Sequence, residues 1–215
     1  MMNKRVKAEI KKIHKENHRI RFCLGTIALV FLCIFLLIIA TFTQIKLNLN
    51  IPETSMSSYV KFEYIPQIPV VLFIAALLGE FWGLLSILIY IIMGLTPFYP
   101  IFALGGGLSY IFQYNFGYIF AYIFAVLLVA KELKQKFKII NMIKAVLYGV
   151  LIIHIIGCVY MSIIALLRHD SYEFISNLVY YQSISKILYD IVFGFIAILL
   201  AKGVKKILWL IMGWL

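Results

Sequence analysis

The sequence predicts an all-α membrane protein with six transmembrane helices and both termini in the cytoplasm, on three observations. Hydrophobic residues make up 64% of its 215 residues, a share well above that of a soluble domain, and its mean hydropathy is +1.00. Its apolar runs are long enough for membrane helices, which need about 20 apolar residues each. Lys and Arg gather beside alternate apolar runs, as they do where loops stay in the cytoplasm.

The first half of the chain contains three of the predicted spans. Residues 22–43 form the first apolar run, and the polar residues 44–65 after it predict a loop. The next apolar run is interrupted by Glu80, which one long helix would place near the middle of the membrane, where a carboxylate is costly. Two shorter helices, over 66–79 and 82–95, place this carboxylate in a tight turn at the membrane face instead.

The remaining boundaries follow from the same alternation of apolar runs and polar interruptions. They are a Gly- and Pro-bearing connection over 96–115, a span over 116–130, a basic turn over 131–138, a span over 139–167, a polar connection over 168–182 and a sixth span over 183–201. The chain therefore divides into a basic segment, 1–21, a membrane domain, 22–203, and an aromatic tail, 204–215.

Sixteen of the twenty Lys and Arg residues fall on one side of a six-span topology. Eight of them lie within 1–21, five within 131–144 and three after the sixth span. The positive-inside rule places this side, and therefore both termini, in the cytoplasm. The net charge of +11 thus follows membrane topology, and no nucleic-acid partner is expected.

Residues 1–21 combine this basic charge with an apolar stripe at helical spacing, formed by Val6, Ile10, Ile13 and Ile20. A basic amphipathic helix of this kind lies on the anionic lipid surface of a membrane. A solvated basic tail is the alternative interpretation, and the sequence leaves both open.

A Gly-rich polar cluster falls on the outer face of this topology, within FALGGGLSYIFQYNFGY (102–118). Irregular backbone at membrane depth is tolerated only where it is buried in protein or lines a cavity. We therefore expect a small ligand to approach the backbone closely at Gly105 and Gly106, with Tyr118 among the tyrosines beside it. The alternative is that these glycines only allow tight packing of helix ends.

A second polar cluster opens the last predicted span and contains Lys186 and Asp190. The two residues are four positions apart on one helix face, so their side chains can pair with each other. In the alternative interpretation, Lys186 receives an anionic group of a ligand, such as a carboxylate. An ionisable residue within a membrane segment is a functional-site hypothesis by default.

Residues 77–122, LLGEFWGLLSILIYIIMGLTPFYPIFALGGGLSYIFQYNFGYIFAY, resemble the core signature of the BioY family. The shared features are a Leu-Gly turn at 78–79, a Gly-rich loop at 105–107 and a partly retained Gly-Pro-Thr-Gly-Gly-Tyr motif at 113–118. The family's Gly-Asp-x-x-Lys motif resembles residues 182–186. The resemblance implies the six-helix bundle of the biotin-specific substrate-binding (S) components of energy-coupling factor (ECF) transporters.

The resemblance also implies a set of ligand contacts, several of which are altered in this chain. Lys186 matches the Lys that contacts the biotin carboxylate, whereas Ser183 stands where the family has an Asp that binds the ureido ring. Gln113 and Asn115 bring new amide groups into their motif. Biotin is the implied substrate, and another small carboxylate-bearing nutrient is the alternative. The implied substrate-binding residues are Gly105, Gly106, Gln113, Asn115, Tyr118, Ser183 and Lys186.

The resemblance further implies transport partners in the cell membrane rather than an enzyme. An S component docks on a membrane coupling subunit that is driven by a pair of ABC-type ATPases. The sequence holds no GxxxxGK[ST] loop, which cradles ATP phosphates. ATP hydrolysis is therefore expected from those partners, and no cofactor is expected in this chain.

Three hypotheses from other classes compete with transport by an S component. An intramembrane serine protease would pair Ser109 with His154, but Tyr110 stands where such a serine is followed by Gly. An ion-coupled carrier would need more acids in its spans than Glu80 and Asp190, and a structural membrane protein is the third. No metal is expected: His14 and His18 stand at i, i+4, but they lie in the basic segment outside the bundle.

Overall fold

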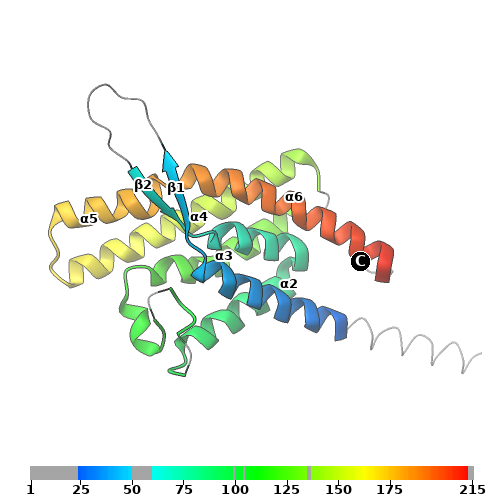
Figure 1. The fold of residues 1–215 in the computed structure, drawn as a ribbon, viewed down its shortest axis with the longest axis horizontal. Helices are drawn as coiled ribbons and strands as arrows, with labels where there is room; N and C mark the ends of the chain where they lie inside the picture. The colour runs from blue at the N-terminus through cyan, green and yellow to red at the C-terminus, as the bar shows by residue number, and fades with distance from the viewer. Residues whose placement is uncertain (1–23, 50–59, 99, 104, 135–136, 213–215) are drawn as a thin grey trace, which may run out of the picture.

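The computed structural model describes residues 24–49, 60–98, 100–103, 105–134 and 137–212, and Figure 1 shows their arrangement. Five helical stretches in these ranges are long and apolar enough to cross a membrane, which confirms the predicted all-α membrane class. They are the first helix, Leu24–Phe42; α2, Gln67–Leu95; α3, Phe116–Leu133; α4, Ile139–Leu167; and the last stretch, Tyr172–Leu208, formed by α5 and α6. The predicted basic segment, 1–21, lies outside the described residues.

Helix α2 contains the predicted break between two shorter helices. Gly79 has φ +76° and ψ −165°, a conformation that only glycine adopts readily. A Cβ atom at Gly83 would lie 3.6 Å from the Cα atom of Ala75, although eight residues of straight helix rise by about 12 Å. The chain therefore folds back at Gly79, which confirms the break and leaves Glu80 exposed at the bend.

A β-hairpin occupies part of the region where the sequence predicts a loop, so that prediction is wrong. Strands β1, Ile45–Leu49, and β2, Val60–Tyr64, pair antiparallel, with Ile45 opposite Tyr64. Each strand alternates apolar and polar residues, which is the period of a half-buried strand. The two strands are only five residues long and lie inside a polar region, so they could not be predicted from its composition.

Most of the predicted polar connection over 168–182 is helical. Helix α5, Tyr172–Val179, begins after Ser171, whose side chain accepts a hydrogen bond from a backbone N–H three residues on, as a helix N-cap does. A π-helical turn, Tyr180–Ile184, leads on to α6, Ile187–Met212. Helix α6 thus continues well past the predicted end of the last span.

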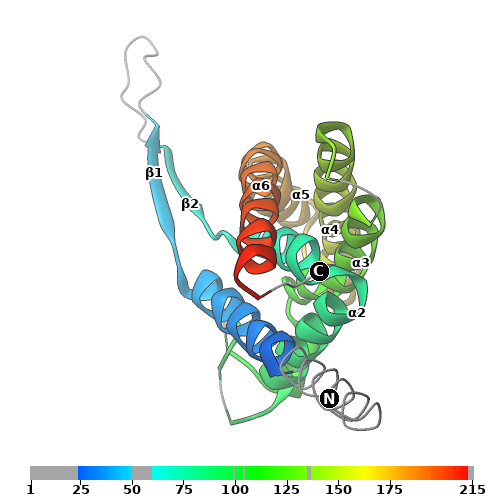
Figure 2. The same ribbon diagram turned by 90° about the vertical axis from the view of Figure 1, so that its right-hand side faces the viewer.

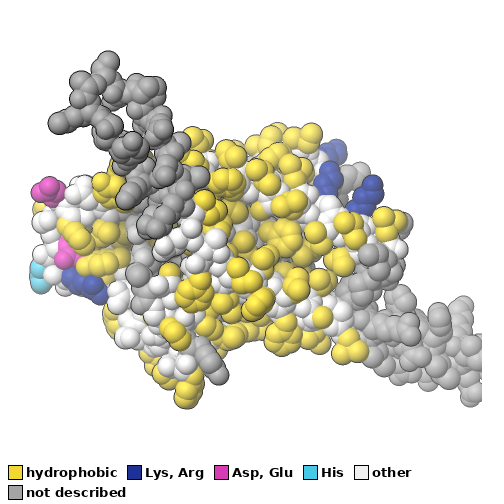
Figure 3. Space-filling view, in the orientation of Figure 1, with side chains coloured by type: hydrophobic (Ala, Val, Ile, Leu, Met, Phe, Trp, Pro, Cys, Tyr) yellow, Lys and Arg dark blue, Asp and Glu magenta, His cyan; other side chains and the backbone are white. Residues whose placement is uncertain are grey.

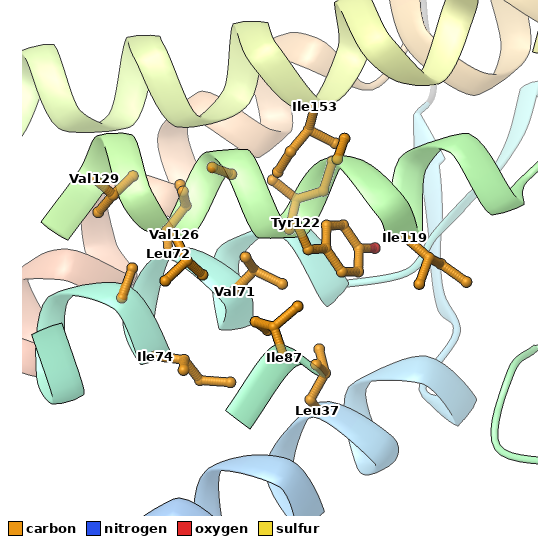
Figure 4. Packing of buried hydrophobic residues seen from close by; sticks show 14 of the residues in the cluster. Leu37, Val71, Leu72, Ile74, Ile87, Ile119, Tyr122, Val126, Val129 and Ile153 are labelled. Carbon is orange, nitrogen blue, oxygen red and sulfur yellow. The ribbon is translucent and has the colours of Figure 1, made fainter. Parts of the chain in front are cut away.

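The core lies where α2, α3 and α4 pack together, as Figure 4 shows from close by. Leu72 of α2 is fully buried, and Cβ atoms at Gly149 of α4 and Gly194 of α6 would lie 2.5 and 2.6 Å from its methyl groups. Small residues of this kind let membrane helices approach closely. The first helix joins the same core where Leu37 points toward Ile87.

The two ends of the bundle differ in character. One end, the loop end, carries the β-hairpin, the connection between α2 and α3 and the turn between α4 and α5 (Figure 1). The opposite end, the lysine end, carries the turn between α3 and α4 and the C-terminal half of α6, which faces the viewer in Figure 2. On the face drawn in Figure 3, charged side chains gather at the two ends and the surface between them is hydrophobic. This apolar belt suits contact with lipid.

Candidate functional site

A cavity of about 100 Å³ lies at the loop end, between the hairpin, the α2–α3 connection and the first turns of α2, α3 and α6. It combines aromatic side chains with amide groups, a lysine and a carboxylate. The lining residues are Tyr64, Ile65, Gln67, Ile68, Ala103, Tyr110, Asn115, Tyr118, Ile119, Tyr122, Gln182, Lys186 and Asp190.

One wall of this cavity is a chain of hydrogen bonds that crosses α3, α4 and α6. Asp190 is buried on α6, accepts a hydrogen bond from the Tyr64 hydroxyl at 2.7 Å and lies 3.1 Å from Nε2 of His154. Nδ1 of His154 lies 2.8 Å from Oγ of Ser183. The Ser183 Oγ lies 2.7 Å from the Tyr118 hydroxyl. The wall thus links four segments that are distant in the sequence.

The direction of these hydrogen bonds follows from the carboxylate at one end. An ionised Asp190 is only an acceptor, so Nε2 of His154 carries a proton. Nδ1 of His154 and Oγ of Ser183 form the next hydrogen bond, and Ser183 also accepts from the Cys158 thiol, whose Sγ lies 3.0 Å away. Among the described residues, no buried side-chain nitrogen or oxygen lacks a hydrogen-bond partner. The wall is therefore held in place by its own bonds.

Tyr64 ties the β-hairpin to this wall. Its ring packs against Tyr189 and Phe193 of α6, with ring centroids 6.2 and 5.3 Å apart. Burial and the neighbouring Asp190 carboxylate both raise the pKa of Tyr64 above its usual value, because each disfavours a phenolate. The hydroxyl therefore stays protonated at neutral pH and continues to donate to Asp190.

A second polar group, centred on Gln67, joins the first helix, α2 and α3 beside the cavity. Nε2 of Gln67 donates to Oγ1 of Thr41 at 2.7 Å, and Oε1 accepts from the Tyr122 hydroxyl at 3.0 Å. Oγ1 of Thr41 also lies 2.9 Å from the Tyr90 hydroxyl. These bonds orient Gln67 and Tyr122, both of which line the cavity.

Lys186 brings a cation to the same space. It is half-buried just before α6, and its Nζ donates to Oε1 of Gln182 at 3.2 Å. Lys186, Gln182 and Asp190 all line the cavity. An ammonium group and a carboxylate therefore face one small volume, an arrangement that can bind a ligand carrying both an anionic group and N–H donors.

Comparison with known proteins decides the family. The model of the BioY family matches residues 13–209, which is most of the chain. The chain belongs to the BioY family. A crystal structure at 2.1 Å of "the S-component for biotin from an ECF-type ABC transporter" has a TM-score of 0.62 and 19% identity to it, covering 86% of this chain and 93% of that one. At this identity the likeness shows a shared fold. A search of curated proteins found no match.

Four of the predicted substrate-binding residues of this BioY family member lie together at the cavity. Asn115, Tyr118 and Lys186 line it. Ser183 is buried directly behind Tyr118, held by the hydrogen bond between their hydroxyls. Ser183 is thus placed to act on a ligand through Tyr118, and a ligand role for each of the four stays a prediction.

The other three predicted residues lie outside the lining: Gly105, Gly106 and Gln113. Gly105 and Phe102 exchange two backbone hydrogen bonds, at 3.0 and 3.1 Å. Gly105 and Gly107 have φ values of +130° and +86°, a region that favours glycine. The glycines therefore shape the turn of the connection through their backbone angles, and a Cβ atom at Gly105 would meet no atom within 4 Å, so close packing does not require glycine there. Ala103 of this connection lines the cavity.

The side chains at the site that were not predicted as ligand-binding residues include Tyr64, Gln67 and His154. Tyr64 was hidden by the missed hairpin, and Gln67 looked like the polar start of a helix. A lone histidine in a span is more often a hydrogen-bonded packing residue than a protease partner of Ser109, and the bonds of His154 to Ser183 and Asp190 fit that interpretation.

The structure does not form the serine–histidine pair of the protease hypothesis. Ser109 is exposed, whereas His154 is buried and bonded to Ser183 and Asp190. The Ser183 hydroxyl is itself enclosed by Tyr118 and Cys158, so a substrate carbonyl has no access to it. Among the described residues, no three His, Cys, Asp or Glu side chains are grouped so as to hold a metal ion.

Proposed function

We propose that this BioY family protein is the substrate-binding subunit of an ECF-type transporter and that its substrate is biotin. The observation that carries the proposal is the loop-end cavity, where Lys186 and Asp190 face the same space. Biotin has a carboxylate at one end and a ureido ring with two N–H donors and a carbonyl at the other. A cation can bind the carboxylate, and a hydrogen-bond acceptor can bind the ureido N–H groups. The protein of similar structure is an S-component for biotin, which supports the same substrate.

The cavity offers a partner for each polar end of such a ligand. Lys186 binds the carboxylate, and Asp190 accepts from a ureido N–H. Each carboxylate oxygen can accept two hydrogen bonds, so Asp190 can accept from a ligand donor while it keeps its bond to His154. The Asn115 amide donates to the ureido carbonyl. Asp190 thereby takes the part of the carboxylate that the family carries at the position of Ser183.

Binding requires the cavity to widen. Its volume of about 100 Å³ is below the roughly 300–1,000 Å³ of small-molecule sites. The hairpin and the α2–α3 connection form the walls that do not belong to the helical bundle. We expect these two segments to move outward when the ligand enters, while the helices keep their packing.

The topology of the proposal counts α2 as two crossings, because the chain folds back at Gly79. With six crossings, both termini lie at the lysine end, and the positive-inside rule puts that end in the cytoplasm. The cavity at the loop end then opens to the outside of the cell membrane. Release inside depends on partners, namely a membrane coupling subunit and an ABC-type ATPase pair.

Mass spectrometry of the small molecules extracted from the purified protein tests the substrate. We expect biotin in the extract and saturable biotin binding after the ligand is stripped. Another small carboxylate-bearing nutrient in the extract would keep the S-component function and replace the substrate. Biotin uptake by cells tests the function separately, and uptake that persists without the ATPases would contradict it in favour of an independent carrier.

A further inference from the structure

A second cavity lies at the opposite, lysine end of the bundle. It encloses about 500 Å³ between the bend of α2, the last turns of α3, the α3–α4 turn and α6. Its lining includes two small residues of α2, Ala75 and Ala76, and two lysines, Lys134 and Lys205. It shares no lining residue with the loop-end cavity.

Lys205 is positioned in this lysine-end cavity by the turn between α3 and α4. It is half-buried, with its Nζ 5.2 Å from the ring centroid of Phe137, a cation–π contact. Lys202 holds the same turn, because its Nζ donates to the Phe137 carbonyl at 3.1 Å. Within the described ranges, neither Lys134 nor Lys205 forms a salt bridge. The protein therefore holds the Lys205 ammonium group in place without neutralising it.

The charge and polarity of the lining define what can occupy this cavity. Two ammonium groups face one carboxylate, that of the exposed Glu80, which leaves one net positive charge. Most of the other lining residues are apolar, and Phe81 at the bend leaves 69% of its surface exposed. An occupant needs an anionic group joined to an apolar body. A free phosphate lacks the apolar body, and a basic helix lacks the anion.

We propose that the lysine-end cavity binds an anionic phospholipid. Its phosphate contacts Lys134 and Lys205, and its acyl chain runs along Phe81 toward the apolar belt of the bundle. Basic pockets between membrane helices at the cytoplasmic side are where anionic head groups bind. This site is independent of the substrate at the loop end.

Trp82 provides a reporter for this lipid. Its ring lies edge-on to Phe81 with centroids 5.2 Å apart, and the chain has three tryptophans. In a Trp209→Phe/Trp214→Phe background, brominated lipid that enters the cavity quenches Trp82 alone. The protein is titrated with brominated phosphatidylglycerol or brominated phosphatidylcholine in detergent micelles. Half-maximal quenching is expected at a phosphatidylglycerol concentration about 25-fold below that of phosphatidylcholine, because each lysine raises the affinity for the anionic lipid about fivefold.

Variants assign this preference to the cavity. The double variant Lys134→Gln/Lys205→Gln is expected to lose the preference for phosphatidylglycerol. The control double variant Lys131→Gln/Lys206→Gln loses the same charge at exposed lysines outside the lining and should keep the preference. Lys205→Arg keeps the charge and the preference. Equal quenching by the two lipids in the parent protein, or equal loss in both double variants, would overturn the proposal. Recovery of fluorescence on adding inorganic phosphate would show a simple anion site and overturn the lipid assignment.

Discussion

Replacing His154 with Ala is expected to destabilise the protein by about 1–3 kcal/mol, because it removes the His154 N–H group that donates to the buried Asp190 carboxylate. His154 and Asp190 are both buried, with Nε2 and Oδ2 3.1 Å apart. The same change removes the Nδ1 acceptor that lies 2.8 Å from the Ser183 hydroxyl. Ser183 can still bond to Tyr118, so the lost N–H donor to the Asp190 carboxylate, which keeps only the Tyr64 hydroxyl among the bonds described, makes the larger contribution.

Asp190→Asn tests the same pair from the other side. Asn keeps a hydrogen-bonding group but carries no charge, so the expected loss is about 1–2 kcal/mol. In the double variant with His154→Ala there is no unpaired charge. The double variant should therefore lose about 2 kcal/mol less than the sum of the two single changes, as contacting residues do in such cycles.

Unfolding by SDS in mixed detergent micelles, followed by far-ultraviolet circular dichroism, gives the free energies of unfolding of the four proteins. His169→Asn is the matched control, because His169 is exposed and Asn tolerates its φ of +59°. The control should stay within about 0.5 kcal/mol of the parent. Losses for His154→Ala and Asp190→Asn that simply add in the double variant would show that the pair is not coupled and would refute the network.

Three further predictions address the ligand, the bend and the hairpin. Lys186→Ala should weaken biotin binding in calorimetry at least tenfold, about 1.4 kcal/mol, and should abolish any preference for biotin over its neutral amide, whereas Lys206→Ala at the other end should change neither. Gly79→Ala should lower the free energy of unfolding by about 1–3 kcal/mol through backbone strain at φ +76° alone, since its Cβ would meet no atom within 4 Å. The control is Gly203→Ala, which is equally uncrowded but lies in regular helix and should not destabilise the protein. Equal losses of stability in the two variants would refute the strain argument. The pKa of Tyr64 is raised in the folded protein, so its contribution to stability is complete below the unfolded pKa of about 10 and is lost as pH rises through its folded pKa. Tyr64→Phe should therefore lose less stability than the parent protein above pH 10. Parallel pH profiles of the free energy of unfolding in the two proteins would contradict this prediction.

The helices and the bend could be predicted because each rests on a local pattern. A long apolar run predicts a membrane helix without information from the rest of the chain. A glycine beside Glu80 inside such a run predicts a turn that brings the carboxylate to the membrane face. Strands β1 and β2 could not be predicted in the same way. Each is five residues long, and the pairing of Ile45 with Tyr64 depends on two segments meeting across a polar stretch.

In the candidate site, too, residues in local motifs could be predicted, whereas contacts between distant segments could not. Asn115, Tyr118 and Lys186 were reached through motif resemblance, and the cavity brings them together. The contact of Asp190 with Tyr64 joins residues 126 positions apart, and no local spacing reveals such a pair. The sequence shows Asp190 as a neighbour of Lys186 on one helix face and as one of two acids in the spans, while its partners come from a strand and from another helix.

The loop-end cavity has one wall that resists movement and others that are easier to move. Displacing Asp190 on α6 would disturb a chain of buried hydrogen bonds through His154 and Ser183, each worth about 1 kcal/mol and more where a group is left unpaired. The hairpin, by contrast, reaches this wall through Tyr64. A ligand N–H that donates to Asp190 can replace the Tyr64 hydroxyl as the hairpin lifts, so the carboxylate never lacks a partner. The helices would then set which ligand binds, and the Tyr64–Asp190 hydrogen bond would govern when the cavity opens to admit it.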